Sequence, residues 1–144
     1  MKCLYARLDV YSDGGARGNP GPAAAAYVIV SEGGEVLKAE SRFIGRRTNN
    51  QAEYEALFAA LEVALAFQPE VVTCRLDSEL VCKHLTGEYK VKDPELRRLY
   101  DKVIVLRGCF KKISFLNVPR TNPFIEDADR LVNEKLDEAA EKHL

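Results

Sequence analysis

The first third of the chain has the alternating hydrophobic pattern of β-strands. Residues 4–12 alternate apolar and polar side chains, the period of two expected of a strand with one buried face. Two more apolar segments follow, separated by the turn residues Gly33 and Gly34, and the three together predict an antiparallel meander. Shorter β-branched segments recur later. The predicted strands are residues 4–12, 23–30, 35–44, 71–76 and 113–118.

Helical periodicity marks most of the remaining chain. Leu57, Leu61 and Leu65 belong to an apolar stripe with the spacing of an amphipathic helix, which Pro69 ends. Asp93 followed by Pro94 is typical of an N-cap and the first helical position. The predicted helices are residues 51–67, 78–85 and 94–107, and a last helix begins near residue 126, after a loop at 119–125.

The order of these elements, β-β-β-α-β-α-α-β-α, predicts an α/β fold with a mixed sheet. Right-handed β-α-β crossovers join parallel strands, so the fourth and fifth strands should lie alongside the first. With 144 residues, 47% of them hydrophobic, the chain is expected to form one domain, residues 1–144. Residues 13–22 are dense in glycine and proline and predict an irregular turn after the first strand.

Charge and cysteine content narrow the function classes. A formal net charge of −1 excludes a globally basic nucleic-acid binder, so an anionic partner would have to be held by local clusters. The chain has neither a signal-peptide pattern nor the stretch of about 20 apolar residues that spans a membrane, so we expect a cytoplasmic monomer without a membrane partner. Cys3, Cys74, Cys82 and Cys109 have no C-x-x-C spacing, which argues against structural zinc.

Two acidic residues follow predicted strands directly. Asp13 comes after the first strand and Asp77 after the fourth. Because ligands bind at the carboxyl ends of the parallel strands in such sheets, we expect both carboxylates at one edge. The alternative for Asp13 is a hairpin loop in which its side chain forms an Asx-turn.

Two more acids lie on helix faces that are otherwise apolar. Glu53 precedes Leu57 by four residues, and Asp129 precedes Val132 by three, so each heads a core-facing stripe. A carboxylate on a buried face is unfavourable unless it is paired or binds a metal ion. The alternative for both is a first-turn carboxylate that complements the helix dipole.

Four carboxylates at one end of a sheet repel one another, and a divalent cation is the usual reason to tolerate this. Ligation by oxygen alone suits Mg²⁺ or Mn²⁺ rather than zinc. Two such ions support in-line displacement at phosphorus. Phosphodiester hydrolysis is therefore the reaction class that the acids indicate.

Five motifs, in chain order, resemble those of type 1 ribonuclease H and cover essentially the whole chain. Each motif is weak alone, whereas the ordered set is specific. The motifs are Tyr11-Ser12-Asp13-Gly14-Gly15, Gly18-Asn19-Pro20-Gly21-Pro22, Thr48-Asn49-Asn50-Gln51-Ala52-Glu53-Tyr54, Leu76-Asp77-Ser78-Glu79-Leu80 and Ala128-Asp129-Arg130-Leu131-Val132-Asn133.

The resemblance implies a ribonuclease H-like fold, with a five-stranded mixed sheet of order 3-2-1-4-5 flanked by helices. It also implies an endoribonuclease that hydrolyses the RNA strand of RNA–DNA hybrids with two Mg²⁺ ions, with Mn²⁺ as a substitute, leaving 5′-phosphate and 3′-hydroxyl ends. It carries the catalytic and metal-ligand roles onto Asp13, Glu53, Asp77 and Asp129. The implied substrate contacts are Gly14, Asn19, Thr48, Asn49, Asn50, Gln51, Ser78 and Glu79; helix capping is the alternative for Asn49 and Asn50.

The chain departs from the family pattern at two places. The loop at 119–125 lacks the histidine of many members, and Val118-Pro119-Arg120 resembles variants that use arginine instead, so Arg120 is the candidate for an auxiliary role. Residues 86–94 replace a basic, Trp-containing protrusion, and the chain has no Trp. It resembles the short form of the family, and we expect weaker hybrid binding than in protrusion-bearing forms.

Two other functions are compatible with such a fold. One is a non-catalytic nucleic-acid-binding module, against which the presence of all four acids argues. The other is a different two-metal nuclease of the same superfold, such as a junction resolvase; the asparagine-rich segment before Glu53 favours the ribonuclease. Whether double-stranded RNA is also a substrate stays open.

Overall fold

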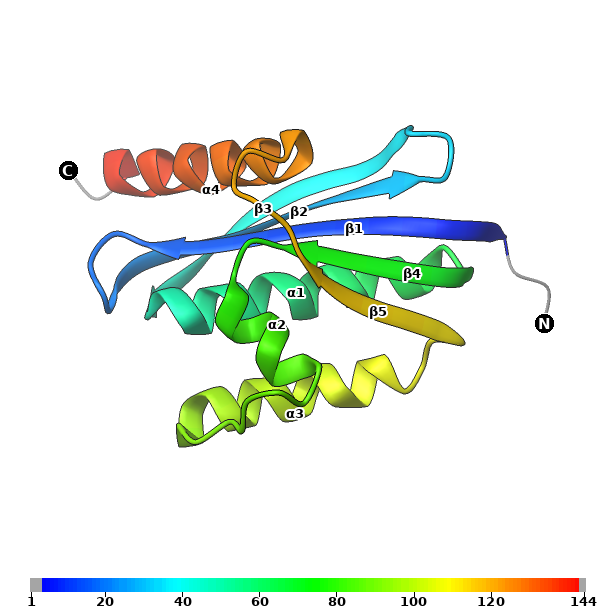
Figure 1. The fold of residues 1–144 in the computed structure, drawn as a ribbon. Helices are drawn as coiled ribbons and strands as arrows, with labels where there is room; N and C mark the ends of the chain where they lie inside the picture. The colour runs from blue at the N-terminus through cyan, green and yellow to red at the C-terminus, as the bar shows by residue number, and fades with distance from the viewer. Residues whose placement is uncertain (1–3, 143–144) are drawn as a thin grey trace.

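The computed structural model of the protein describes residues 4–142 and contains the predicted five-stranded sheet. Its strand order is β3-β2-β1-β4-β5 (Figure 1), as the family resemblance implied. The first three strands form the antiparallel meander, and the last two run parallel to β1. Their bounds are β1 (Tyr5–Ala16), β2 (Gly21–Ser31), β3 (Val36–Arg47), β4 (Pro69–Leu76) and β5 (Lys112–Asn117).

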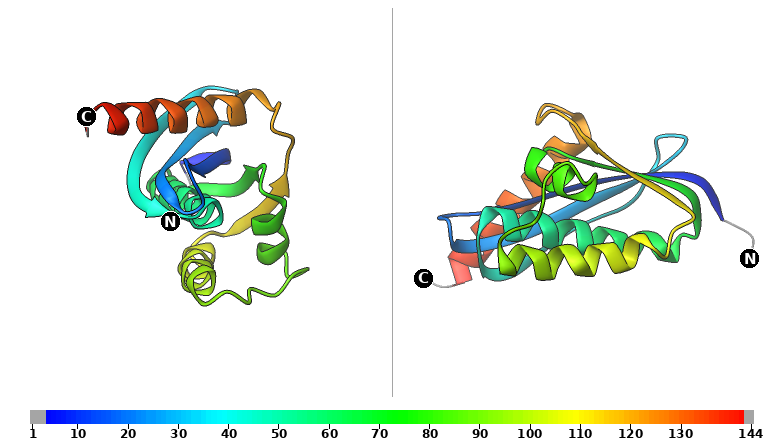
Figure 2. Two further views of the ribbon diagram at one scale, coloured as in Figure 1. Left: turned by 90° about the vertical axis from the view of Figure 1, so that its left-hand side faces the viewer. Right: turned by 60° about the horizontal axis from the view of Figure 1, so that its bottom comes forward.

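Helices cover both faces of the sheet. Three of them, α1 (Asn49–Ala66), α2 (Glu79–Leu85) and α3 (Pro94–Arg107), lie on one face, and α4 (Pro123–Lys142) lies on the other (Figures 1 and 2). Alternate residues of the strands therefore enter different cores: Leu8 and Val10 pack towards α1, whereas Tyr11 packs towards α4. No helix within residues 4–142 is both long and apolar enough to cross a membrane.

Four of the five strands, all but β5, are longer than the sequence pattern predicted. β3 continues through Arg47. β1 continues through Ala16 and β2 begins at Gly21, so the predicted irregular turn at 13–22 is wrong for residues 13–16 and 21–22. The cause is pairing: Asp13 lies opposite Ala26 on β2, and the ladder continues to Ala16 opposite Ala23. Glycine is needed at position 14 for close helix packing rather than for a turn.

The last helix begins earlier than predicted. The Oδ1 atom of Asn122 accepts hydrogen bonds from the backbone N–H groups of Phe124 (3.0 Å) and Ile125 (3.3 Å) and caps a helix that starts at Pro123. Asp129 therefore lies in the second turn of α4, as Glu53 does in α1. The first-turn dipole role considered for these acids is wrong for both.

Three of the four cysteines are free thiols: Cys74, Cys82 and Cys109. Cys3 lies outside the described residues. That residues 1–144 form a single domain stays a prediction.

Candidate active site

The parallel pairing of β1 with β4 brings the first two acids together. The ladder ends where Ser12 lies opposite Leu76, so Asp13 and Asp77 are the next residues at the same edge of the sheet. Glu53 joins them from α1. Ligand oxygens of these three carboxylates all lie within 4.8 Å of one another.

Glu53 has one carboxylate oxygen bound and one free. Its side chain is only 9% exposed, and Oε1 accepts a hydrogen bond from the backbone N–H of Gly14 at 3.1 Å. Oε2 is buried and has no hydrogen-bond partner. A buried oxygen without a donor is costly. It is the kind of atom that a bound cation satisfies.

Burial and mutual repulsion favour the protonated forms of these acids. The pKa of Asp13 is raised to about 7, chiefly by burial and further by the charges of Asp77 and Asp129. Burial also raises the pKa of Glu53 well above its usual range, with the Asp13 charge as the next cause. The pKa of Asp77 is raised by burial and by Asp129, against the opposing effect of Arg120. Asp129 is thus close enough to interact with two of the clustered acids.

The donor set fits a hard divalent cation. The clustered ligands are carboxylate oxygens, and a cation would offset both the repulsion and the unpaired Glu53 Oε2. Asp13, Glu53 and Asp77 could hold such an ion together, and Asp129 lines the same cleft.

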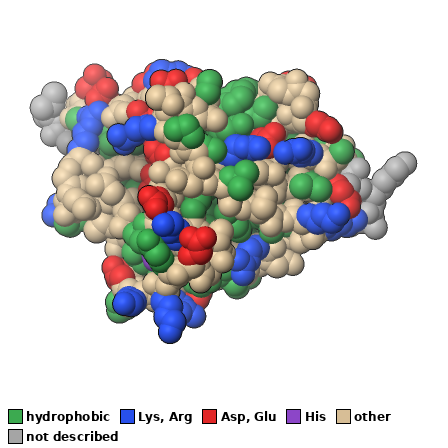
Figure 3. Space-filling model, viewed as in Figure 1, with side chains coloured by type: hydrophobic (Ala, Val, Ile, Leu, Met, Phe, Trp, Pro, Cys, Tyr) green, Lys and Arg blue, Asp and Glu red, His purple; other side chains and the backbone are tan. Residues whose placement is uncertain are grey.

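The carboxylates lie in an open cleft of about 780 Å³. Figure 3 shows acidic side chains in a hollow on this face, with basic side chains around it. Most of the predicted site residues line the cleft: Asp13, Gly14, Asn49, Asn50, Glu53, Asp77, Ser78, Glu79, Arg120 and Asp129. Asn19, Thr48 and Gln51 lie outside the lining.

Several predicted substrate contacts also have a structural role. Thr48 and Gln51 form a reciprocal capping box at the start of α1, with hydrogen bonds of 3.1 and 2.9 Å. The Asn49 side chain accepts a hydrogen bond from the backbone N–H of Ala16 (2.9 Å), and the backbone N–H of Asn49 donates to Oδ1 of Asn19 (3.0 Å). These asparagines therefore fix the β1–β2 turn against α1. Their role in substrate binding stays a prediction.

Ser78, Asn50 and Glu79 also line the cleft. The Ser78 hydroxyl caps α2 by accepting from the Val81 N–H at 3.2 Å. Asn50 is exposed, and Glu79 forms an ion pair with Lys83 at 2.7 Å. These short polar side chains are accessible to a ligand in the cleft.

Arg120 lies at the mouth of the cleft. Its Nε is 3.6 Å from Asp77 Oδ2, and its side chain is 82% exposed, compared with 14% for Asp77. The guanidinium therefore contacts the carboxylate cluster from solvent. This position is compatible with the auxiliary role that the sequence suggested.

The predicted site omitted three polar residues that line the cleft: Arg17, Asn117 and Asn133. Asn133 donates to the backbone oxygen of Asp129 at 3.0 Å and lies four residues after it, a helical spacing that could have identified it. The Arg17 side chain, which directly follows β1, donates a hydrogen bond to the backbone oxygen of Asn133 in α4 at 3.3 Å. No local pattern indicates that contact.

Comparison with known proteins identifies the family. Residues 11–134 match the sequence profile of the family described as "Reverse transcriptase-like". The chain is 47% identical to Ribonuclease HI of Halobacterium salinarum over 92% of its own length. The chain belongs to the type 1 ribonuclease H family.

Solved ribonuclease H structures share the fold. The N-terminal RNase H domain of Rv2228c from Mycobacterium tuberculosis superposes with a TM-score of 0.90 at 37% identity, covering 96% of this chain and 99% of that one. LC11-RNase H1, solved in complex with an RNA/DNA hybrid, gives a TM-score of 0.87 at 41% identity, covering 92% and 99%. The chain spans only 66% of the length of the Halobacterium ribonuclease HI and 37% of the full Rv2228c protein.

Proposed function

We propose that this ribonuclease H domain is a metal-dependent endonuclease that hydrolyses the RNA strand of RNA–DNA hybrids. The observation that carries the proposal is the carboxylate cluster of Asp13, Glu53 and Asp77, with its unsatisfied Glu53 Oε2, at the bottom of an open cleft. The similarity to LC11-RNase H1, whose structure contains such a hybrid, supports the substrate class.

The chain's own residues set the geometry of the reaction. Asp13, Glu53 and Asp77 would hold the metal ions, with Asp129 completing the site from α4. Two bound Mg²⁺ ions, or Mn²⁺ in their place, would supply the Lewis acidity that activates a water and stabilises the leaving oxygen. Attack of water at phosphorus breaks the bond to O3′ and leaves 5′-phosphate and 3′-hydroxyl ends.

Arg120 has an auxiliary role in this proposal. Its exposed guanidinium contacts Asp77 from the mouth of the cleft and can reach a phosphate that occupies the site. Asn49, Asn50 and Ser78 line the cleft with polar groups that can reach 2′-hydroxyl and phosphate groups of a bound hybrid.

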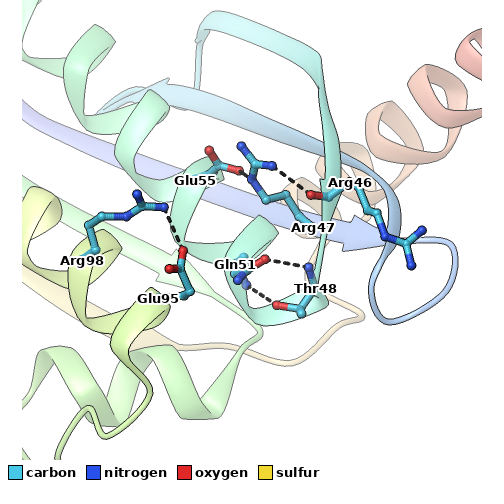
Figure 4. A network of polar contacts seen from close by, with 7 residues as sticks. All are labelled: Arg46, Arg47, Thr48, Gln51, Glu55, Glu95 and Arg98. Carbon is cyan, nitrogen blue, oxygen red and sulfur yellow. Dashed lines mark hydrogen bonds and ion pairs between the residues drawn. The ribbon is translucent and has the colours of Figure 1, made fainter.

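A basic cavity beside the cleft supports binding of the hybrid's second backbone. It measures about 570 Å³ and lies between the end of β3, the first turns of α1, and α3. Arg47 is paired with Glu55 at 3.0 Å and Arg98 with Glu95 at 2.8 Å (Figure 4). Arg46 and Lys102 give the cavity an excess of positive charge, which favours a phosphate backbone.

Cleavage of one labelled sequence presented as hybrid, duplex RNA, duplex DNA and single strands tests the proposal. Each substrate is incubated with Mg²⁺, with Mn²⁺ and with a chelator. We expect metal-dependent cutting of the RNA strand of the hybrid, loss of about 100-fold or more in Asp129→Asn, and little change in Asp127→Asn, a matched aspartate two residues away on α4.

The outcomes discriminate between the candidate functions. Cutting of duplex RNA as well would widen the substrate class and leave the mechanism unchanged. Binding of the hybrid without cutting under either metal would indicate a non-catalytic module. The cytoplasmic location and the monomeric state stay predictions, to be tested by cell fractionation and by light scattering.

A further inference from the structure

A third cavity, of about 350 Å³, lies between β3 and the C-terminal half of α4. It exists because the facing side chains are small: Gly45 on β3 and Ala139 and Ala140 on α4 leave space between strand and helix. Phe43 lines this space and is 42% exposed, which is unusual for a large aromatic side chain in the middle of a strand. The cavity is thus an apolar site with an aromatic wall.

This cavity adjoins the catalytic cleft. Arg17 and Leu136 line both. The Arg17 guanidinium forms an ion pair with Asp137 at 2.7 Å and donates to the backbone oxygen of Asn133, so it is fixed where the two spaces meet. A nucleic-acid strand that leaves the cleft on this side would pass Arg17 before it reaches Phe43.

Two basic side chains, Arg17 and Arg46, line the cavity. The Arg46 guanidinium forms no hydrogen bond or ion pair with any residue in 4–142, and Figure 4 shows it pointing away from the Arg47–Glu55 pair. A further cavity of about 360 Å³ shares Phe43 and extends along α4, lined by Arg42, Lys135 and Lys142.

Glu138 is the one acidic residue that lines either cavity within the described chain, and it is shared between Lys135 and Lys142. The groove formed by the two cavities therefore carries excess positive charge in a protein whose formal net charge is −1. Such local charge favours an anionic ligand.

An exposed aromatic ring within a basic groove is the arrangement that binds single-stranded nucleic acid, with bases stacked on the ring and phosphates near the cations. We propose that a single-stranded extension of the hybrid's RNA strand leaves the catalytic cleft past Arg17 and binds in this groove, with one base stacked on Phe43. The RNA strand is favoured over the DNA strand because the groove shares two residues, Arg17 and Leu136, with the catalytic cleft and only Arg46 with the cavity proposed for the second backbone. The inference rests on the proposed function and deepens it: hybrids with an unpaired RNA tail are the preferred substrates.

The test measures binding in the Asp13→Asn variant, which is expected to bind without cutting. The probes are a blunt hybrid, the same hybrid with an RNA overhang of about six nucleotides at either end, and versions with DNA overhangs. We expect an RNA overhang at one end to tighten binding about tenfold relative to the blunt hybrid, and Phe43→Ala to abolish this difference. Tyr89→Ala removes a ring of similar exposure (48%) from the loop after α2 and should leave the difference unchanged.

Three outcomes overturn the inference. Equal affinity for blunt and extended hybrids would mean that the groove does not bind the overhang and would favour a protein partner there. A preference that survives Phe43→Ala would place the overhang elsewhere. A DNA overhang that binds as tightly as the RNA overhang would refute the choice of strand. All three are compatible with cutting of the blunt hybrid by the wild-type protein; failure to bind and cut the blunt hybrid would refute the proposed function instead.

Discussion

At the scale of single residues, the burial of Asp13 places its carboxylate in the site but is unfavourable for folding. Asp13 is 6% exposed, lies beside two other carboxylates and interacts with a third. Burial raises its pKa to about 7, so without a cation the folded protein retains a proton that the unfolded chain releases near pH 4. Because the folded state binds more protons between these values, the free energy of unfolding falls as pH rises through this window.

We therefore predict that Asp13→Asn stabilises the metal-free protein in a pH-dependent way. In the presence of a chelator, the variant should be more stable than the wild type by about 1–3 kcal/mol at pH 8 and nearly equal to it at pH 4. Urea unfolding at several pH values measures the difference, with Asp127→Asn as the control. Parallel pH profiles for the wild type and Asp13→Asn would mean that burial of this carboxylate is not costly.

At the scale of elements, α1 packs tightly against β1 at Gly14. A Cβ atom there would lie 2.2 Å from the backbone carbonyl carbon and oxygen of Ala52 and 2.6 Å from the Glu53 nitrogen. The absence of a side chain lets the Gly14 N–H reach Glu53 Oε1, so one glycine sets both the helix position and the orientation of an acid. The next residue is different, since a Cβ on Gly15 would meet only Val132 Cγ1 at 3.6 Å.

Gly14→Ala should accordingly lower the free energy of unfolding by about 2–4 kcal/mol, because backbone atoms of α1 cannot move aside without shifting the helix. Gly15→Ala is the matched control and should change it by less than about 1 kcal/mol. Urea denaturation midpoints compare the two variants. Equal destabilisation of both would show that the helix can move away from β1.

The sequence predicted the type and order of the elements, but not all of their ends. Period-two and period-3.6 patterns identify strands and helices because one face of each is buried. The ends depend on contacts between distant segments: β1 continues to Ala16 because it pairs with β2, and β3 continues to Arg47 for the same reason. The early start of α4 depends on the Asn122 side chain, a cap that the periodicity did not include.

At the scale of the whole molecule, the acidic half of the site was predictable, whereas of its basic surroundings only the adjacent pair Arg46 and Arg47 stands out in the sequence. Asp13, Glu53, Asp77 and Asp129 each stand out locally, either at a strand end or on an apolar helix face. The basic cavities combine side chains from β3, α1, α3 and α4, whose relative positions follow only from the packing of the sheet. With a formal net charge of −1, the protein depends on such local clusters to attract a polyanion.

The last prediction concerns the basic cavity beside α3. Arg98 lines this cavity with Arg46 and Arg47, whereas its neighbour Arg97 pairs with Asp101 and does not line it. In Asp13→Asn, used so that the hybrid is not cut, Arg98→Gln should weaken hybrid binding about three- to tenfold at low salt.

The same variant should also make the slope of log K against log salt, where K is the association constant, less steep by about 0.9. This is the change expected when one counterion fewer is released on binding. Arg97→Gln should alter neither the affinity nor the slope, although it removes the same charge from the same helix. Anisotropy titrations of the blunt hybrid at several salt concentrations measure both quantities. If the two variants weakened binding equally, net charge rather than the cavity would govern the affinity, and the hybrid's second backbone would have to follow a different path across the protein.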